Sequence, residues 1–179
     1  MNERYSLHDP LPKDAKSIID LIRLSWFEIY PNKSHGITEE YIEELADRLL
    51  GKTGEEDLMR RIIEFPNDAY SFKKIAKDTD GNIVGYVTGR LNVGEYELEN
   101  FFIKKEHQGT GLSMLLWNSF LEWTDVSKVI WLEMTPYTER APAFYKKIGF
   151  EIVPNSESFS GETIIPMITM VRKSSKTNQ

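Results

Sequence analysis

The stretch at residues 103–117, "IKKEHQGTGLSMLLW", decides the fold because it joins an apolar strand pattern to a helical pattern through two glycines. Gly109 and Gly111 follow the apolar "FFI" and precede leucines and a methionine at helical spacing. Small residues at the start of a helix let its free N–H groups approach an anion closely. The glycines alone support an anion-binding loop and a simple strand-to-helix turn equally well.

The two common nucleotide-binding loops fit this stretch poorly. A P-loop requires lysine followed by serine or threonine after its second glycine, but this chain has Leu112 and Ser113 there. A dinucleotide fingerprint requires a third glycine and a parallel strand before the loop. The third glycine is missing, and the preceding strands are predicted to form an antiparallel meander.

The flanking sequence predicts one domain of mixed α/β (α+β) class at residues 1–172, followed by a disordered polar tail at residues 173–179. Helical spacing of apolar residues follows Pro12 and Thr38 and precedes Pro66, with "GKTGEED" as a break. Helices are also expected at "LSMLLWNSF" and "TERAPAFYKK". The expected strands are "AYSFKKIAKDTDGNIVGYVTGRL" with its central turn, "EYELENFFI", "KVIWLEM" buried on both faces, "FEIV", and "TIIPMITMVRK" with Pro166 at a bulge or edge.

The composition excludes several classes of function. The chain has 179 residues and no cysteine, which excludes disulfides, thiolate metal sites and cysteine nucleophiles. Its 28 acidic and 22 basic residues give a net charge of -6, whereas nucleic-acid binders normally carry a basic excess. No apolar run approaches the roughly 20 residues of a membrane helix, and the N-terminus lacks a signal-peptide core. We therefore expect a cytoplasmic protein without nucleic-acid or membrane partners and, because His and Asp do not meet at ligand spacing, without a metal.

Several motifs in order resemble the GNAT family of N-acetyltransferases. The cofactor loop of that family has Gln or Arg, any two residues, Gly, any residue, and then Gly or Ala, and here Gln108, Gly111 and Ser113 take those places. The segment "DGNIVGYVTGRL" is similar to the strand that precedes the family's cofactor strand, and "ERAPAFYKKIGF" is similar to a later helix that carries a tyrosine. The chain departs from the family pattern at Ser113, at Thr138, where asparagine is common, and at Pro142.

The resemblance implies a mixed, largely antiparallel central sheet with helices on both faces and one splayed pair of strands that receives acetyl-CoA. Acetyl-CoA is then a co-substrate, its pyrophosphate bound by backbone N–H groups of the glycine loop and its pantetheine paired with the free edge of the preceding strand. The residues expected to bind it are Phe102, Ile103, Gln108, Gly109, Thr110, Gly111, Leu112 and Ser113.

The resemblance also implies catalytic residues. Tyr145 matches the tyrosine that lies near the cofactor sulfur, where a protonated phenol would act as general acid to the thiolate. Glu97 lies on the cofactor strand where one branch of the family carries a glutamate base, although a solvated strand edge explains it equally well. Glu99, Trp26 and Tyr30 are expected at the acceptor site, although aromatic residues on such helices are more often core residues.

These motifs predict an acetyl-CoA-dependent N-acetyltransferase that acts on a primary amine by direct transfer in a ternary complex. Without cysteine, no thiol can carry the acetyl group. A small amine is favoured as acceptor, with a polyamine suggested by the acidic charge balance. A protein N-terminus or lysine as acceptor, and an acetyl-CoA-binding regulatory or structural domain without catalysis, remain alternatives. The sequence leaves a homodimer open.

Overall fold

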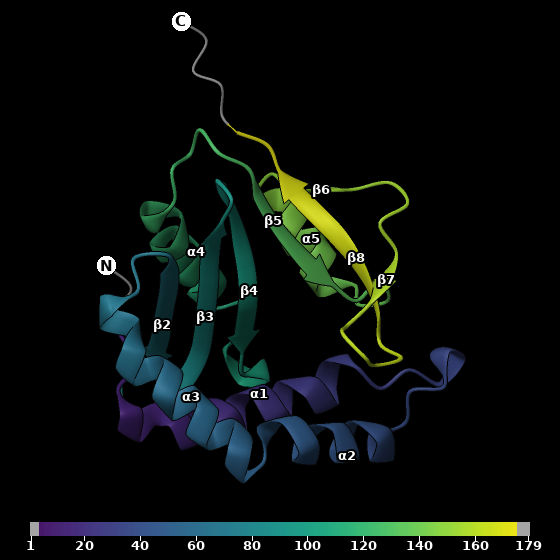
Figure 1. Cartoon of the computed structure of the whole chain (residues 1–179), viewed down its shortest axis with the longest axis horizontal. Helices are drawn as coiled ribbons and strands as arrows, with labels where there is room; N and C mark the ends of the chain where they lie inside the picture. The colour runs from purple at the N-terminus through teal and green to yellow at the C-terminus, as the bar shows by residue number, and fades with distance from the viewer. Residues whose placement is uncertain (1–3, 175–179) are drawn as a thin grey trace, which may run out of the picture.

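The computed structural model describes residues 4–174, which form one mixed sheet with helices on both faces (Figure 1). The strand order is β1-β2-β3-β4-β5-β8-β6, with β7 paired to β8, and every pair is antiparallel except β4–β5. The predicted fold class is confirmed. The strands are β1 (Ser6–His8), β2 (Ser71–Lys77), β3 (Ile83–Asn92), β4 (Glu95–Ile103), β5 (Ile130–Met134), β6 (Glu151–Ile152), β7 (Ser158–Phe159) and β8 (Pro166–Arg172).

The helices cover the two faces of the sheet separately. Figure 1 shows α1, α2 and α3 on one side and α4 and α5 on the other. Their bounds are α1 (Ala15–Ile29), α2 (Glu39–Leu50), α3 (Lys52–Glu64), α4 (Leu112–Trp123) and α5 (Arg140–Lys147). Thr38 begins α2 as expected, because its side-chain oxygen accepts a hydrogen bond from the N–H of Tyr41 at 3.1 Å.

The core has one layer on each face of the sheet. Val87 and Leu98 pack toward α4 and α5, whereas Tyr86 packs with α1 and α3. Helix α4 lies so close to β3 that a side chain at Gly89 would overlap the ring of Phe120. These two core layers hold the sheet rigidly from both faces, so the sheet can position a site between β4 and β5.

The structure corrects three of the expected elements. Helix α3 begins at Lys52, so most of "GKTGEED" is helical, because Gly54 packs directly on the Leu49 carbonyl and lets α3 follow α2 at once. Strand β5 is buried on one face only, since Glu133 is exposed. Pro166 begins β8 rather than interrupting it, so its missing N–H removes no bond inside that strand. The short strands β1 and β7 were not predicted.

Strands β4 and β5 diverge soon after they meet. Their parallel pairing joins only Tyr96 to Ile130 and Glu97 to Trp131, and from residue 98 onward β4 is paired only with β3. The β3–β4 pairing also skips one residue, because Thr88 opposes Asn100 while Gly89 opposes Leu98. Glu99 is therefore the extra residue of a β-bulge at the point where β4 leaves β5. The splayed pair expected from the family resemblance is present.

Candidate active site

The glycine loop connects the diverging end of β4 to α4. After one short 3-10 turn (Lys105–His107), Gly109 and Gly111 adopt left-handed φ angles of 77° and 91°, and α4 begins at Leu112. Within residues 4–174, no side chain caps this helix end. The first N–H groups of α4 are therefore available to an anionic ligand, which is the arrangement that a pyrophosphate requires.

The loop is held by Tyr5, a residue for which the sequence gives no signal. The Tyr5 hydroxyl lies 2.9 Å from both His107 Nδ1 and Thr110 Oγ1. The Thr110 hydroxyl donates to the His107 carbonyl oxygen at 2.7 Å, so its oxygen can accept from Tyr5 while Tyr5 accepts from His107 Nδ1–H. This closed ring of hydrogen bonds joins the N-terminal segment to a loop about 100 residues later.

Gln108 links the loop to both sides of the divergence. Its side-chain amide donates to the Ile103 carbonyl oxygen at the end of β4 at 3.3 Å, and its oxygen accepts from Arg140 Nη1 of α5 at 3.0 Å. Arg140 was not predicted as a site residue. Gln108 therefore has a structural role in this chain, because its side chain connects the end of β4 to α5 across the gap.

Tyr145 lies in the layer behind the gap, on α5. It is 9% exposed, and its ring packs edge-on against Phe101 of β4 and Phe150. No hydrogen bond joins its hydroxyl to another residue of the described chain, 4–174. Burial, and to a smaller extent the neighbouring Tyr30, raise the pKa of Tyr145. The phenol is therefore protonated at neutral pH and has a proton free to donate.

Tyr30 follows the last residue of α1 and is close enough to Tyr145 to affect its pKa. Its carbonyl oxygen accepts a hydrogen bond from the Tyr137 hydroxyl at 2.8 Å, and burial together with Tyr137 raises the pKa of Tyr30 to about 12. Trp26 packs edge-on against Tyr30 at 5.7 Å and also contacts the apolar clusters under α1 and α2. The structure thus brings Tyr30 beside Tyr145 and places Trp26 mainly in the core.

Three carboxylates surround the point of divergence. Glu97 accepts a hydrogen bond from Asn92 at 3.3 Å, whereas Glu99 accepts from Arg90 Nε at 3.2 Å. Burial, then the negative charges of Glu99 and of Glu133 on β5, raise the pKa of Glu97. Glu133 was not predicted as a site residue, because "KVIWLEM" was expected to be a strand buried on both faces. A carboxyl with a raised pKa beside the gap can accept a proton from an amine more readily than an ordinary glutamate can.

Neither a metal site nor a membrane-spanning helix is found in the described part of the chain. Within residues 4–174, no three His, Asp or Glu side chains are arranged to hold a metal ion. No helix in the same range is long and apolar enough to cross a membrane.

Comparison with known proteins identifies the family. The model of the acetyltransferase (GNAT) family matches residues 20–150, so the chain belongs to the GNAT family of acetyl-CoA-dependent N-acetyltransferases. The predictions of family and of enzyme class are confirmed. A search of curated protein sequences gave no significant match.

Solved structures show the same fold at low sequence identity. The PaiA N-acetyltransferase of Thermoplasma acidophilum, in complex with coenzyme A, superposes with a TM-score of 0.75 at 18% identity, over 94% of this chain and 98% of that chain. A GNAT acetyltransferase of Streptococcus pneumoniae gives a TM-score of 0.70 at 20% identity, over 94% and 98% of the two chains. A variant of the spermidine N-acetyltransferase SpeG of Vibrio cholerae gives 0.63 at 21% identity, over 97% and 95%.

Proposed function

We propose that this protein transfers the acetyl group of acetyl-CoA to a primary amine of a small molecule, directly and within a ternary complex. One observation carries the proposal: β4 pairs with β5 only at Tyr96 and Glu97, and the free edge of β4 then leads to the uncapped start of α4. A ligand with an extended amide-containing arm and a pyrophosphate matches that line of backbone groups. Acetyl-CoA has both features.

Different backbone groups along β4 and the glycine loop would bind different parts of acetyl-CoA. Backbone N–H groups from Gln108 to Ser113, including those of Gly109, Thr110, Gly111 and Leu112, would bind the pyrophosphate. The backbone of Phe102 and Ile103 would pair with the pantetheine amides. An N–H group of β4 beyond the bulge would polarise the thioester carbonyl.

Two side chains are proposed to move protons. Glu97 would take a proton from the acceptor ammonium, directly or through water, because its pKa is raised and it lies where the strands diverge. Tyr145 would protonate the departing thiolate, because its hydroxyl has no partner among the described residues. Tyr30, Glu99 and Trp26 would bound the acceptor site on the opposite face of the sheet from α4.

The acceptor is proposed to be a small amine. Polyamines belong among the candidates because the chain is acidic overall and because SpeG, a structural neighbour, is named as a spermidine N-acetyltransferase. Lys73 and Arg61 on the acceptor side of the sheet weigh against a purely cationic acceptor.

Two measurements test the proposal. Calorimetric titration with coenzyme A should show binding to the wild type and none to Gly111→Trp, whose bulky side chain would block the loop and cannot readily adopt the φ angle of 91°. A Met114→Trp variant on the exposed outer side of α4 is the control. Thiol release from acetyl-CoA over a panel of amines, amino acids, polyamines and peptides then tests transfer. Coenzyme A binding without turnover on any member would favour a regulatory domain, and equal binding by Gly111→Trp would refute the loop assignment.

A further inference from the structure

A cavity of about 210 Å³, lined by both apolar and charged side chains, lies on the α1–α3 side of the sheet, next to the β4 bulge. Glu99 and Asn100 of β4 form one end, and residues of α1, α2, α3, β2 and β3 form the rest. Because Glu99 marks the point where β4 leaves β5, the cavity adjoins the gap proposed for the thioester. It faces away from α4, so an acceptor in this cavity would approach from the side opposite the glycine loop.

The inner end of the cavity contains a buried lysine. Lys73 of β2 is 7% exposed, its ammonium donates to Ser71 Oγ at 2.9 Å, and it lies 5.1 Å from the centre of the Phe65 ring. Within residues 4–174, no ion pair joins Lys73 to a carboxylate. Burial lowers the pKa of Lys73, while the charges of Glu99 and Asp68, neither of which forms an ion pair with it, act in the opposite direction. A buried ammonium without a direct counter-ion is costly unless an anion binds beside it.

The other charged side chains of the cavity differ between its two ends. Arg61 of α3 also lines the inner end, whereas the lining carboxylate of Asp57 is already paired with Arg60 at 2.8 Å. At the other end, Glu99 is shared with Arg90, and Glu97 and Glu133 lie near it. The inner end therefore holds two cations, Lys73 and Arg61, whereas the end at the gap holds Glu99 with its partner Arg90 and has the carboxylate of Glu97 close by.

Register across the sheet separates the two ends. Lys73 opposes Thr88, and Thr88 opposes Asn100, so the three residues form one row across β2, β3 and β4. Two strand spacings place the backbone of Lys73 roughly 10 Å from that of Asn100. A ligand that reaches both ends must therefore carry a cationic amine and an anionic group at some distance from each other.

On the basis of the proposed function, we propose that the acetyl acceptor is an amine that also carries a carboxylate, as in a diamino acid. Its carboxylate binds Lys73 and Arg61 at the inner end of the cavity, and its distal amine lies beside the β4 bulge. A polyamine of the same length would instead place a second ammonium against these two cations. The two cations thus favour a ligand whose inner end carries a carboxylate over one whose inner end carries only an ammonium.

The test compares acceptors that differ only in the carboxylate. Ornithine and putrescine form one such pair, and lysine and cadaverine form another. We expect the wild type to show a kcat/KM for the amino acid at least about tenfold above that for the diamine, the ratio that corresponds to one charge-assisted hydrogen bond. Equal values, or a preference for the diamine, would overturn the inference. Suppose instead that the enzyme prefers phosphoethanolamine to ethanolamine but does not prefer either amino acid to its diamine. That result would overturn the proposal that the inner end of the cavity binds a carboxylate.

The Lys73→Met variant isolates the cation. It should raise the KM for ornithine by roughly 10- to 100-fold, leave the KM for acetyl-CoA unchanged, and remove the difference between ornithine and putrescine. Lys74→Met is the matched control, because Lys74 is the next residue on β2 but pairs with Asp9 at 2.9 Å outside the cavity. Thermal melting checks that both variants fold. Unchanged discrimination in a folded Lys73→Met variant would refute the role of Lys73.

Equilibrium binding separates this inference from the proposed function. Calorimetric titration of the coenzyme A-saturated protein with ornithine and with putrescine requires no turnover. A protein that acetylates putrescine but binds ornithine no better keeps the proposed function and loses the inference. A protein that binds ornithine through Lys73 but transfers no acetyl group keeps the binding site and loses the proposed catalysis.

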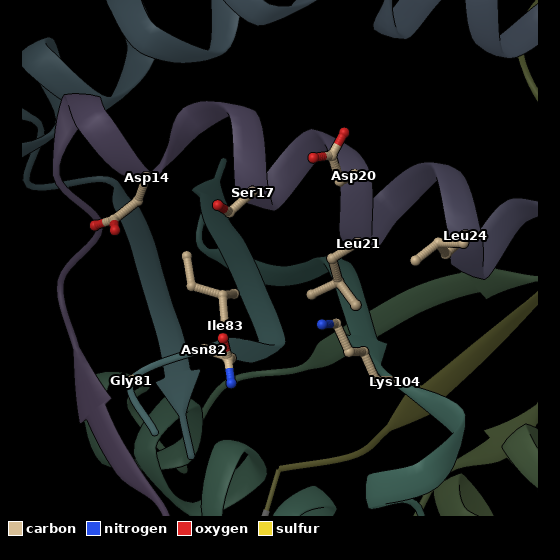
Figure 2. A pocket seen from close by; sticks show the side chains of 9 residues that line it. All are labelled: Asp14, Ser17, Asp20, Leu21, Leu24, Gly81, Asn82, Ile83 and Lys104. Atoms are coloured by element: carbon tan, nitrogen blue, oxygen red, sulfur yellow. The ribbon is translucent and has the colours of Figure 1, made fainter. Parts of the chain in front are cut away.

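A second cavity, of about 250 Å³ between α1 and the β2–β3 turn, does not support a comparable site (Figure 2). Its buried carboxylate, Asp14, already accepts from the Leu11 N–H at 2.9 Å and from Lys77 at 3.2 Å. In Figure 2, the Asp20 carboxylate lies on the side of α1 away from Lys104. The polar groups of this cavity are thus largely used within the fold.

Discussion

Replacing Tyr145 with phenylalanine separates a catalytic hydroxyl from a core tyrosine. The ring packs against Phe101, Phe144 and Phe150, and phenylalanine keeps all of these contacts. The hydroxyl donates to no other residue of the described chain, 4–174, so its removal leaves no partner unsatisfied. We therefore expect the free energy of unfolding to change by less than about 1 kcal/mol.

The effect on catalysis should be much larger. Loss of a general acid typically lowers the rate of the chemical step by roughly 100- to 10,000-fold, which is about 3–5 kcal/mol in activation free energy. Because burial raises the pKa of Tyr145, the wild-type phenol stays protonated through the pH range of the assay and the defect should not disappear at high pH. The affinity for coenzyme A should not change, since the hydroxyl acts only on the departing thiolate.

Single-turnover thiol release from acetyl-CoA, with an accepted amine in excess, measures this step without interference from product release. Thermal melting and coenzyme A titration of the same preparation serve as controls. Tyr137→Phe is the comparison variant, because it removes a different tyrosine hydroxyl, one that donates to the Tyr30 carbonyl oxygen at 2.8 Å, and leaves the Tyr145 hydroxyl in place. A Tyr145→Phe variant that transfers acetyl at the wild-type rate would refute the assignment.

Three further predictions concern the base, the loop and the sheet. We expect the acid limb of the pH–rate profile to report the ionisation of Glu97. The Glu133→Gln variant should move this limb to lower pH, because removal of one repelling charge lowers the raised pKa of Glu97. An acid limb at the same pH in the variant would exclude Glu97 as the titrating group. Tyr5→Phe breaks the hydrogen bonds to the loop at 2.9 Å, including that to Thr110, and should weaken coenzyme A binding by roughly fivefold, about 1 kcal/mol, in calorimetry. Gly89→Ala would force a side chain against the α4 core and the Glu97 carbonyl oxygen, so unfolding should become easier by about 1–3 kcal/mol in denaturant titration; an unchanged midpoint would show that α4 can shift.

Local patterns accounted for much of the fold. Residues 95–103 form β4 as predicted from alternation, and α4 follows the glycine loop at Leu112. The errors occurred where contacts outside the segment decide the structure. Helix α3 contains a glycine that would weaken an isolated helix, but Ile62 anchors it in the core with α1.

The candidate site was predictable to a similar extent. The family motif predicts the glycine loop and Tyr145 as site residues, and the structure brings Tyr30, also predicted, close to Tyr145; their functional roles stay predictions. No sequence pattern pointed to Tyr5, Glu133 or Lys73. Tyr5 contacts a loop about 100 residues later, and Glu133 approaches Glu97 from another strand. Lys73 has the sequence context of an ordinary exposed strand lysine, and its burial depends on the helices packed over β2.

Sequence patterns alone were sufficient for the order of the longer elements, the glycine loop before α4 and the family to which the chain belongs. These properties depend on the backbone preferences and hydrophobic spacing of neighbouring residues, which local chemistry sets. Three features depend on the tertiary structure: the point where β4 leaves β5, the approach of Glu133 to Glu97, and the position of Lys73 at the inner end of a cavity. Strand register and the bulge at Glu99 control those positions, and both arise from pairing across the sheet rather than from any single segment.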